Sequence, residues 1–247
     1  MKGLMSTHTS CALTLTIAVA MLPSNAFAQR VGDFTSIQRG ETAQQPDTSS
    51  EPPSTARAEA RVANCGYGDR SVVELPVGYD FIAQYNSATW TNGHGLVLET
   101  RCDGQEHTNE NGYACYMERT QLEDGIYSRA LAVHPNWVGA NTFVRGIYGP
   151  YMTAGPVTIQ GKIGFRRHWE TSKDGAIFSV SKRDVEAARE ITLFETHHEE
   201  RGRLGQFSSR IVEVQGPFCL ILTVDAGQTT NHDWAAWVDV RVTGTGD

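Results

Sequence analysis

The run His197-His198-Glu199-Glu200 is the densest group of side chains that could bind a metal or exchange protons. Consecutive residues of a strand point to opposite faces, so these four side chains converge only where a loop folds them together. The run also differs from the HExxH pattern, in which two histidines four positions apart share one helix face. A solvent-exposed loop is therefore the predicted structure, with a weakly held transition-metal ion at the surface as the alternative.

Three tryptophans stand beside polar residues that could belong to loops. A sugar-binding surface needs a flat apolar ring for the C–H face of a pyranose and a few rigid polar groups for its hydroxyls. Because a tryptophan beside a strand more often packs in the core, burial of each ring is the alternative interpretation. The candidate ligand-binding residues are Trp90 in segment 86–94, Asn136 and Trp137 after a His-Pro pair, and Arg167, His168 and Trp169.

The sequence contains no recognisable catalytic motif. It has no Gly-x-Ser-x-Gly segment and no phosphate-binding glycine-rich loop, and cysteines joined in disulfides cannot act as nucleophiles. Carboxylate pairs such as Glu99 with Asp103, or Glu118 with Glu123, could hydrolyse glycosides only at a defined separation in space. Since the sequence does not give that separation, catalysis is unsupported, and a hydrolase is kept as an alternative.

Residues 1–28 are typical of a cleaved signal peptide. Lys2 precedes the compact apolar run CALTLTIAVAML, and the segment ends at Ala26-Phe27-Ala28, a small-x-small cleavage site. The run is shorter than the roughly 20 apolar residues that a membrane-spanning helix needs. A lipoprotein signal is the alternative, but Cys11 stands too early in the apolar run for it. We therefore expect a secreted or periplasmic protein.

Residues 29–64 are rich in Gln, Ser, Thr, Pro, Glu and Ala and are predicted to be a disordered linker. Residues 65–247 are long enough for one well-buried domain. The chain has 21 basic and 28 acidic residues, and loss of Lys2 leaves a net charge of 20 − 28 = −8. Without a Lys/Arg-rich run, this charge argues against nucleic acid and anionic membranes as partners. No apolar run after residue 28 has the length of a transmembrane segment.

Four cysteines remain after the signal, at Cys65, Cys102, Cys115 and Cys219. An even number of cysteines in an exported chain predicts two disulfides. Three pairings are possible, and we favour Cys102–Cys115, which would close a Gly/Asn-rich loop, together with Cys65–Cys219. A zinc site is the alternative, although no CxxC spacing supports it.

Turn-forming residues recur about every eight to twelve positions in residues 65–247, as they do in all-β sandwiches and barrels. The clearest strand is residues 218–224, in which the even-numbered residues are apolar and share one face. In residues 237–242 the valines at 238, 240 and 242 are expected to share a face in the same way. Further strands are predicted at residues 164–169, 176–180, 191–196 and 207–214.

Residues 182–190 interrupt this pattern with the sequence KRDVEAARE. Helix propensity favours one or two helical turns there. The alternative is an extension of the two flanking strands around a turn. In either case the segment is a local feature of an all-β domain, because period-2 patterns stand on both sides of it.

The segment at residues 218–242, FCLILTVDAGQTTNHDWAAWVDVRV, resembles the end of the NPCBM family of carbohydrate-binding modules. In that family an apolar strand runs into Asp-x-Gly, an Asp/His pair and a tryptophan before the last strand. Residues 125–134, 161–165 and 173–180 are similar to other segments of the family, so the resemblance covers roughly residues 125–243. The order His232-Asp233-Trp234 departs from the family, and Trp237 corresponds better to its tryptophan.

This resemblance implies a jelly-roll β-sandwich of the galactose-binding-like type and a glycan as ligand. His232, Asp233 and Trp237 are expected to fix the closing strand against its loop and not to contact sugar. No organic cofactor is expected. The resemblance also suggests a structural calcium ion, although no EF-hand spacing is present. Its oxygen ligands would come from Asp225, Asn231, Asp233 and Asp239.

The sequence thus predicts a secreted or periplasmic, non-catalytic binding module with a jelly-roll β-sandwich fold. Its expected partner is a glycan on a cell surface or an envelope polysaccharide, or else another envelope or secreted protein. Two alternatives remain open: a structural or protein-interaction sandwich without sugar binding, and a hydrolase built on the histidine-rich run or on unrecognised carboxylates.

Overall fold

The computed structural model describes residues 62–100, 110–137, 142–167, 174–199, 202–210, 212, 216–227 and 234–244. The predicted signal peptide and nearly all of the predicted linker therefore lie outside the described residues. All described residues belong to one unit of the chain, Ala56–Asp247. Their secondary structure is almost entirely β.

The regular elements of the described residues are thirteen strands and one short 3₁₀ helix, η1 (Tyr85–Ser87). No helix in this part of the chain is long and apolar enough to cross a membrane. The strands are β1 (Val62–Asn64), β2 (Asp69–Ser71), β3 (Val73–Glu74), β4 (Thr89–Asn92), β5 (Tyr113–Gln121), β6 (Tyr127–His134), β7 (Phe143–Met152), β8 (Val157–Phe165), β9 (Ala176–Asp184), β10 (Glu190–His198), β11 (Gly205–Ser208), β12 (Phe218–Asp225) and β13 (Ala235–Gly244).

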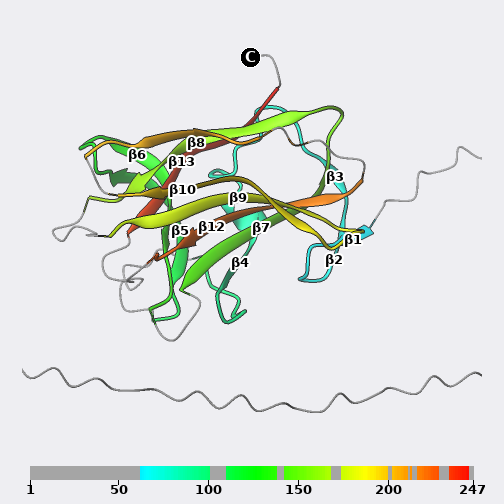
Figure 1. The fold of residues 1–247 in the computed structure, drawn as a ribbon, viewed down its shortest axis with the longest axis horizontal. Helices are drawn as coiled ribbons and strands as arrows, with labels where there is room; N and C mark the ends of the chain where they lie inside the picture. Colours follow the sequence, from blue (N-terminus) through cyan, green and yellow to red (C-terminus); the bar gives the residue numbers. More distant parts are fainter. Residues whose placement is uncertain are drawn as a thin grey trace, which may run out of the picture. The chain divides into compact units, whose positions relative to one another are not determined.

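Two sheets face each other across one core (Figure 1). In the described residues the first sheet has the order β10-β9-β12-β7-β3, with β4 also paired to β7, and the second has the order β11-β8-β13-β6-β5. From β6 to β13 the chain changes sheet at every step except between the neighbours β9 and β10. This alternation is the strand order of a jelly roll, so the predicted fold class is confirmed.

Strand β12 shows why the sequence forms this sandwich. Phe218, Leu220, Leu222 and Val224 belong to the main core between the sheets, as the period-2 pattern predicts. The intervening Cys219 and Ile221 pack in a smaller cluster on the outer face of the same sheet. Because both faces of β12 are covered, and β7 and β9 flank it on either side, this strand is apolar at nearly every position.

Strand β13 departs from the predicted alternation. A bulge lies between Val238 and Arg241, where Asp239 adopts a φ of 52°. The extra residue shifts the side-chain alternation by one position. Trp237 and Val240 therefore both face the main core, whereas Val238 packs on the outer face of the sheet. The predicted common face of the three valines was wrong for Val238.

β12 and β13 belong to opposite sheets and do not pair with each other. Residues 182–190 contain no helix: β9 and β10 extend around a turn, so the alternative interpretation holds. Of the predicted strand 164–169, the first two residues end β8, Arg166 forms an isolated bridge to Leu122, and residues 168–169 lie outside the described residues. The predicted strand 207–214 is shorter as β11, with Val212 in an isolated bridge to Val157. Val62–Asn64, assigned to the linker, form β1.

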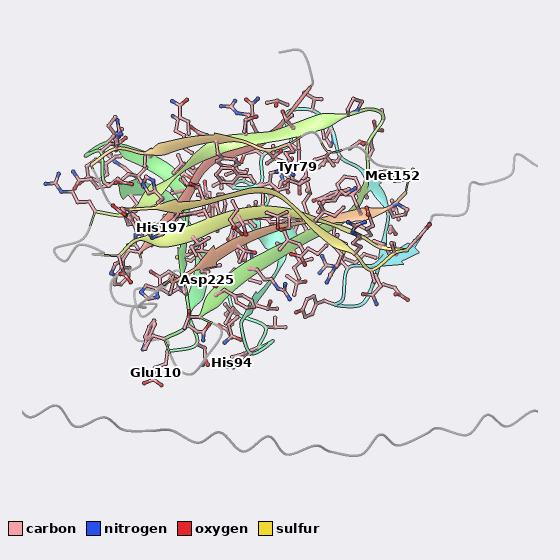
Figure 2. All side chains as sticks on the ribbon, in the orientation of Figure 1. Tyr79, His94, Glu110, Met152, His197 and Asp225 are labelled. Carbon is pink, nitrogen blue, oxygen red and sulfur yellow. A yellow bond between two sulfur atoms is a disulfide. The ribbon has the colours of Figure 1, made fainter. Side chains whose placement is uncertain are left out.

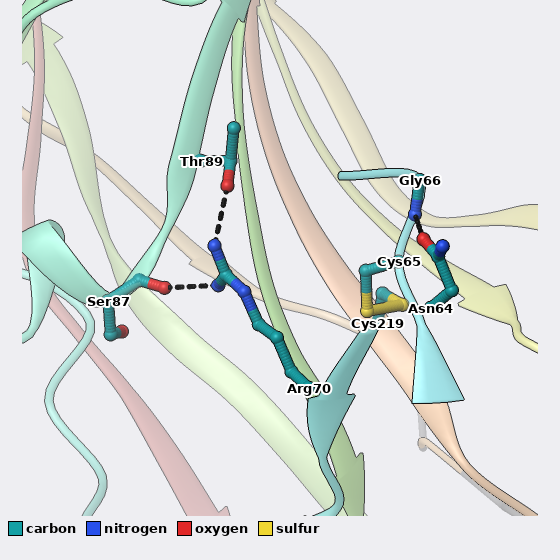
Figure 3. The surroundings of a disulfide bond; sticks show 7 residues. All are labelled: Asn64, Cys65, Gly66, Arg70, Ser87, Thr89 and Cys219. Carbon is teal, nitrogen blue, oxygen red and sulfur yellow. Dashed lines mark hydrogen bonds between the residues drawn. A yellow bond between two sulfur atoms is a disulfide. The ribbon is translucent and has the colours of Figure 1, made fainter. Parts of the chain in front are cut away.

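A disulfide joins Cys65, directly after β1, to Cys219 in β12, with the two Cα atoms 5.9 Å apart (Figure 3). This is the favoured pairing for these two cysteines. Beside it, Asn64 Oδ1 accepts a hydrogen bond from the Gly66 amide at 2.5 Å. Arg70 donates to the Ser87 carbonyl and the Thr89 hydroxyl, which ties β2 to η1 and β4. Cys115 is also disulfide-bonded, and its predicted partner Cys102 lies outside the described residues.

Replacing Cys65 and Cys219 together by serine should lower the free energy of unfolding by about 2–5 kcal/mol. The bridge links residues 154 positions apart, so it strongly restricts the unfolded chain. Denaturant unfolding followed by tryptophan fluorescence measures the difference, and the double replacement leaves no unpaired thiol at this site. An unchanged unfolding midpoint would show that the bridge adds nothing to stability.

The ring of Trp90 fills the space left by a glycine on the neighbouring strand. Trp90 in β4 pairs with Gly146 in β7, and a Cβ on Gly146 would lie 2.5 Å from two carbon atoms of the indole. The indole Nε1 donates to the Tyr85 carbonyl at 3.0 Å. Trp90 is 1% exposed, so it is a core residue and cannot present its ring to a ligand, contrary to its place among the candidate binding residues.

The substitution Gly146→Ala should destabilise the domain by about 1–3 kcal/mol, because the added methyl group overpacks the core against Trp90. Gly155→Ala is the matched control, since a Cβ there meets nothing within 4 Å. Thermal unfolding of the two variants gives the comparison. Equal melting temperatures would contradict this account of the Trp90 packing.

Candidate functional site

One end of the sandwich gathers strand ends and the loops between them. Figure 2 places His197, Asp225 and Glu110 toward this end and Met152 toward the opposite end. The strands β6, β8, β10 and β12 finish here, and β5, β7, β9, β11 and β13 begin here, as their pairing registers require. Most of the sequence-predicted site residues fall in these connections.

Four rings meet at this end in an aromatic cluster made of Tyr113, His134, Trp137 and Trp234. The His134 ring contacts Trp137 edge-to-face, with centroids 4.9 Å apart, and Trp234 likewise at 5.4 Å. Tyr113 lies 5.8 Å from His134 and 6.2 Å from Trp234. Tyr113 and His134 are buried, whereas Trp137 and Trp234 are half-buried. The two indoles are therefore the members that reach the surface.

The pairing of β5 with β6 positions these rings. Tyr113 stands opposite His134 in the register, and the Trp137 amide donates to the Glu110 carbonyl at 3.2 Å. Gly112 has a φ of +80°, and a Cβ there would lie 2.6 Å from the His134 carbonyl oxygen. Only glycine suits both this conformation and this close approach. His134 Nδ1 lies 2.7 Å from the Pro135 carbonyl and donates to it, which fixes the ring orientation.

Arg166 supplies the charged group of the aromatic cluster. Its guanidinium lies 5.4 Å from the centroid of the Trp234 ring, and its Nη1 donates to the Tyr113 hydroxyl at 3.4 Å. The Arg166 amide donates to the Trp234 carbonyl at 2.7 Å, which holds the strand ends together. Within the described residues, the buried Nε atom of Arg166 has no hydrogen-bond partner.

The structure separates the sequence-predicted binding residues. Trp137 belongs to the aromatic cluster, and Asn136 is fully buried directly before it, where it supports the loop and cannot contact a ligand freely. Arg167 is exposed but lies away from the cluster, next to Gly125. His168 and Trp169 lie outside the described residues. Trp234 and Arg166 were not among the predicted residues, although both flank predicted ones in the sequence.

The histidine-rich run does not converge, as strand alternation predicts. His197 and His198 end β10, and their side chains point to opposite faces. His197 is exposed, with its Nε2 2.5 Å from the Asp174 carbonyl. His198 turns inward and its Nε2 donates to Glu123 Oε1 at 2.7 Å. The predicted loop was therefore wrong for both histidines, which end a strand, and the predicted exposure was wrong for His198.

The Glu123 carboxylate is buried at this end of the sandwich. Its side chain has no exposed surface, and that of His198 is 13% exposed. The same Oε1 atom also accepts a hydrogen bond from the Phe165 amide at 3.1 Å. The His198 ring stacks on Phe165 with centroids 5.7 Å apart. This buried pair joins β10 of one sheet to β8 and the β5–β6 connection of the other.

A cleft of about 370 Å³ opens beside this pair. Most of its walls are polar, so it could admit a small polar molecule. Gly205 is adjacent to the imidazole, since a Cβ there would lie 3.2 Å from His198 Nδ1. The lining residues are His197, His198, Glu199, Arg203, Leu204, Gly205 and Gln206.

The residues suggested for calcium do not form a site within the described part of the chain. Asp225 Oδ1 accepts a hydrogen bond from the Gly227 amide at 3.0 Å, whereas Asp239 pairs with Lys162 at 3.5 Å on the other sheet. Asn231 and Asp233 lie outside the described residues, as does His232. Among described residues, no three His, Cys, Asp or Glu side chains are placed to hold a metal ion.

The substitution His198→Ala should destabilise the domain by about 3 kcal/mol, because it leaves the buried Glu123 carboxylate without the imidazole that donates a hydrogen bond to it. His197→Ala is the matched control: this neighbour is exposed and should change stability by less than about 1 kcal/mol. Denaturant unfolding at neutral pH measures both. Equal effects of the two substitutions would mean that the buried pair has no special part in stability.

Among known proteins, only solved structures are found to be similar to this chain. No protein-family model matches the chain, and no curated protein matches it. The resemblance to the NPCBM family thus stays a prediction. Of solved structures, 31 chains are similar.

Three of the similar structures contain carbohydrate-binding modules of different families. CBM51-2 with INT domains of Clostridium perfringens ZmpB, in complex with GlcNAc, is 18% identical over 62% of this chain and 29% of that chain, with a TM-score of 0.37. The CBM22-1–GH10 modules of Clostridium thermocellum xylanase 10B, complexed with xylohexaose, are 14% identical over 70% and 28%, with a TM-score of 0.42. A CBM29-2 variant is 17% identical over 64% and 91%, with a TM-score of 0.32.

This chain therefore spans less than a third of the first two of these structures. At these identities and TM-scores the similar structures assign no ligand and no site to this chain.

Proposed function

We propose that this domain is a non-catalytic glycan-binding module and that the aromatic cluster is its binding surface. The observation that carries the proposal is the pair of half-buried indoles, Trp137 and Trp234, beside a guanidinium with an unsatisfied buried donor at Arg166. An indole offers a flat apolar face to the C–H groups of a pyranose. The guanidinium offers directed donors for hydroxyl oxygens. Both kinds of group thus meet at one end of the sandwich.

The cluster is pre-organised for binding. Edge-to-face contacts fix Trp137 and Trp234 against the buried His134 ring, which is itself fixed by Pro135. A ligand therefore gains contact with rings whose rotamer freedom is already lost on folding, which reduces the entropy cost of binding. This rigidity favours binding over a merely structural role for the two half-buried indoles.

The hydrolase alternative receives no support from the carboxylate pair that the described residues contain. Glu118 is exposed and accepts a hydrogen bond from the Tyr116 hydroxyl, whereas Glu123 is buried behind His198 and Phe165. The two carboxylates thus have different partners and different exposure. Of the pair Glu99 and Asp103, the second residue lies outside the described residues.

We place the ligand outside the cytoplasm, on a cell surface or in an envelope polymer. This part of the proposal rests on the signal-like residues 1–28 and the low-complexity residues 29–61, which would tether the domain. A test is cleavage of the full chain on expression: mass spectrometry should find a mature N-terminus at Gln29. An intact N-terminus in the exported fraction would contradict this part.

The substitution Trp137→Ala should weaken binding to a neutral polysaccharide by roughly thirtyfold or more, as expected for loss of an aromatic anchor of about 2 kcal/mol. Affinity electrophoresis against a panel of neutral polysaccharides identifies the ligand and measures the loss. Trp137→Phe should retain part of the affinity because it keeps an aromatic face. Met152→Ala, at the opposite end of the sandwich, is the control for an exposed apolar side chain.

Melting temperatures of the three variants should remain close to that of the parent chain. Binding that survives Trp137→Ala and Trp234→Ala unchanged would overturn the assignment of the surface. Absence of any glycan ligand, together with capture of one defined protein partner that Trp137→Ala abolishes, would instead favour the protein-interaction alternative.

A further inference from the structure

The tip of the β5–β6 hairpin forms a second surface, separate from the aromatic cluster. Gln121 pairs with Tyr127 across the hairpin. On its other side, Leu122 bridges to Arg166, and the Arg167 amide donates to the Gln121 carbonyl at 2.8 Å. Three segments thus lie side by side as a small ribbon at the surface.

Strand alternation decides which side chains share the outer face of this ribbon. Leu122 is 1% exposed and packs with Val238 against the outer face of the sheet. Its bridge partner Arg166 turns toward Trp234. The residues next to them, Gln121 and Arg167, therefore face outward, together with Tyr127, the cross-strand partner of Gln121. The side chains of Arg166 and Arg167 consequently point to opposite faces of the same segment.

This outer face carries an exposed aromatic ring with one guanidinium stacked on it, and a second guanidinium at the adjacent turn. Tyr127 is 54% exposed, and the Arg119 guanidinium lies 4.9 Å from its ring centroid. Arg167 is exposed, and its Nη1 lies 3.8 Å from the position that a Gly125 Cβ would occupy. We name the set Arg119, Gln121, Tyr127 and Arg167 the hairpin face.

The charges of the hairpin face are available to a ligand. In the described part of the chain, neither Arg119 nor Arg167 forms an ion pair. Glu118, the acid next to Arg119, is engaged by the Tyr116 hydroxyl, and this hydrogen bond raises the pKa of Tyr116 above its ordinary value. In a chain with a net charge of −7, two unpaired guanidinium groups on one face select for an anion.

The tip is held rigidly, as a binding face requires. The Glu123 amide donates to the Phe165 carbonyl at 2.9 Å, and Glu123 accepts from His198 and from the Phe165 amide. Asp124 Oδ1 accepts from the Ile126 amide, and Gln121 Nε2 donates to the Gly125 carbonyl. The turn therefore presents Tyr127 and the two arginines in a fixed arrangement before any ligand binds.

We propose that the hairpin face binds an acidic sugar residue, a pyranose that carries a carboxylate or a sulfate. The C–H face of the sugar would lie on the open side of the Tyr127 ring, and its acidic group would pair with Arg167 and Arg119. A guanidinium matches the planar oxygens of such groups in a forked geometry. This goes beyond the neutral-glycan surface proposed above, because it is a separate surface with its own ligand chemistry.

The test uses the full domain and three polymers: polygalacturonate, dextran sulfate and neutral dextran. The parent protein should be retarded in affinity electrophoresis by at least one of the two acidic polymers and not by dextran. Tyr127→Ala and Arg167→Gln should each weaken this binding about tenfold or more. Arg189→Gln, an exposed arginine in the β9–β10 turn, is the matched control and should change it little. The two acidic polymers separate a carboxylate from a sulfate ligand.

Added salt should weaken the binding, while Trp137→Ala should leave it unchanged. Equal weakening by Arg189→Gln and Arg167→Gln would reveal diffuse charge attraction and overturn the proposal, as would absence of binding to both acidic polymers or capture of protein ligands alone. Loss of acidic-polymer binding in Trp137→Ala but not in Tyr127→Ala would also overturn it. None of these results would contradict the proposal that the aromatic cluster binds a neutral glycan, because that proposal is tested with neutral polysaccharides.

Discussion

The buried carboxylate of Glu123 fixes the geometry of the whole candidate-site end. One oxygen accepts hydrogen from His198 in the first sheet and from the Phe165 amide in the second, so a single atom connects both layers. A charge with no exposed surface is tolerated only with such partners. Phe165 is followed by Arg166 of the aromatic cluster and Arg167 of the hairpin face. The hydrogen bond between Glu123 and the Phe165 amide therefore positions both surfaces relative to each other.

Much of the fold follows from local sequence patterns, and its exceptions come from long-range pairing. The alternation in β12 correctly predicted which side chains face the core and which face the other side of the sheet. A central strand of a sandwich needs apolar residues on its core face. The bulge at Asp239 could not be predicted, because it depends on how β13 pairs with β8. Helix propensity at residues 182–190 likewise yielded to the pairing of β9 with β10.

The site was predictable only in part, because residue type does not reveal exposure. Trp137 reaches the surface of a cluster of rings, but Trp90 has the same side chain and fills the space over Gly146 in the core. The Glu123–His198 pair joins residues 75 positions apart, and no spacing rule connects them. Arg167 was a predicted ligand-binding residue, whereas its neighbour Arg166 was not. Strand alternation directs the Arg166 side chain to the aromatic cluster and the Arg167 side chain to the hairpin face.

The bridge between Cys65 and Cys219 also bears on mechanics. It joins the entrance of the domain to β12, which lies between β9 and β7 inside its sheet. Tension applied to the chain ahead of Cys65 therefore passes through a covalent bond into a strand that is hydrogen-bonded on both sides. Under such a load the disulfide anchors the chain at β12, and β1, which lies ahead of the bond, is the strand that can be peeled from β2.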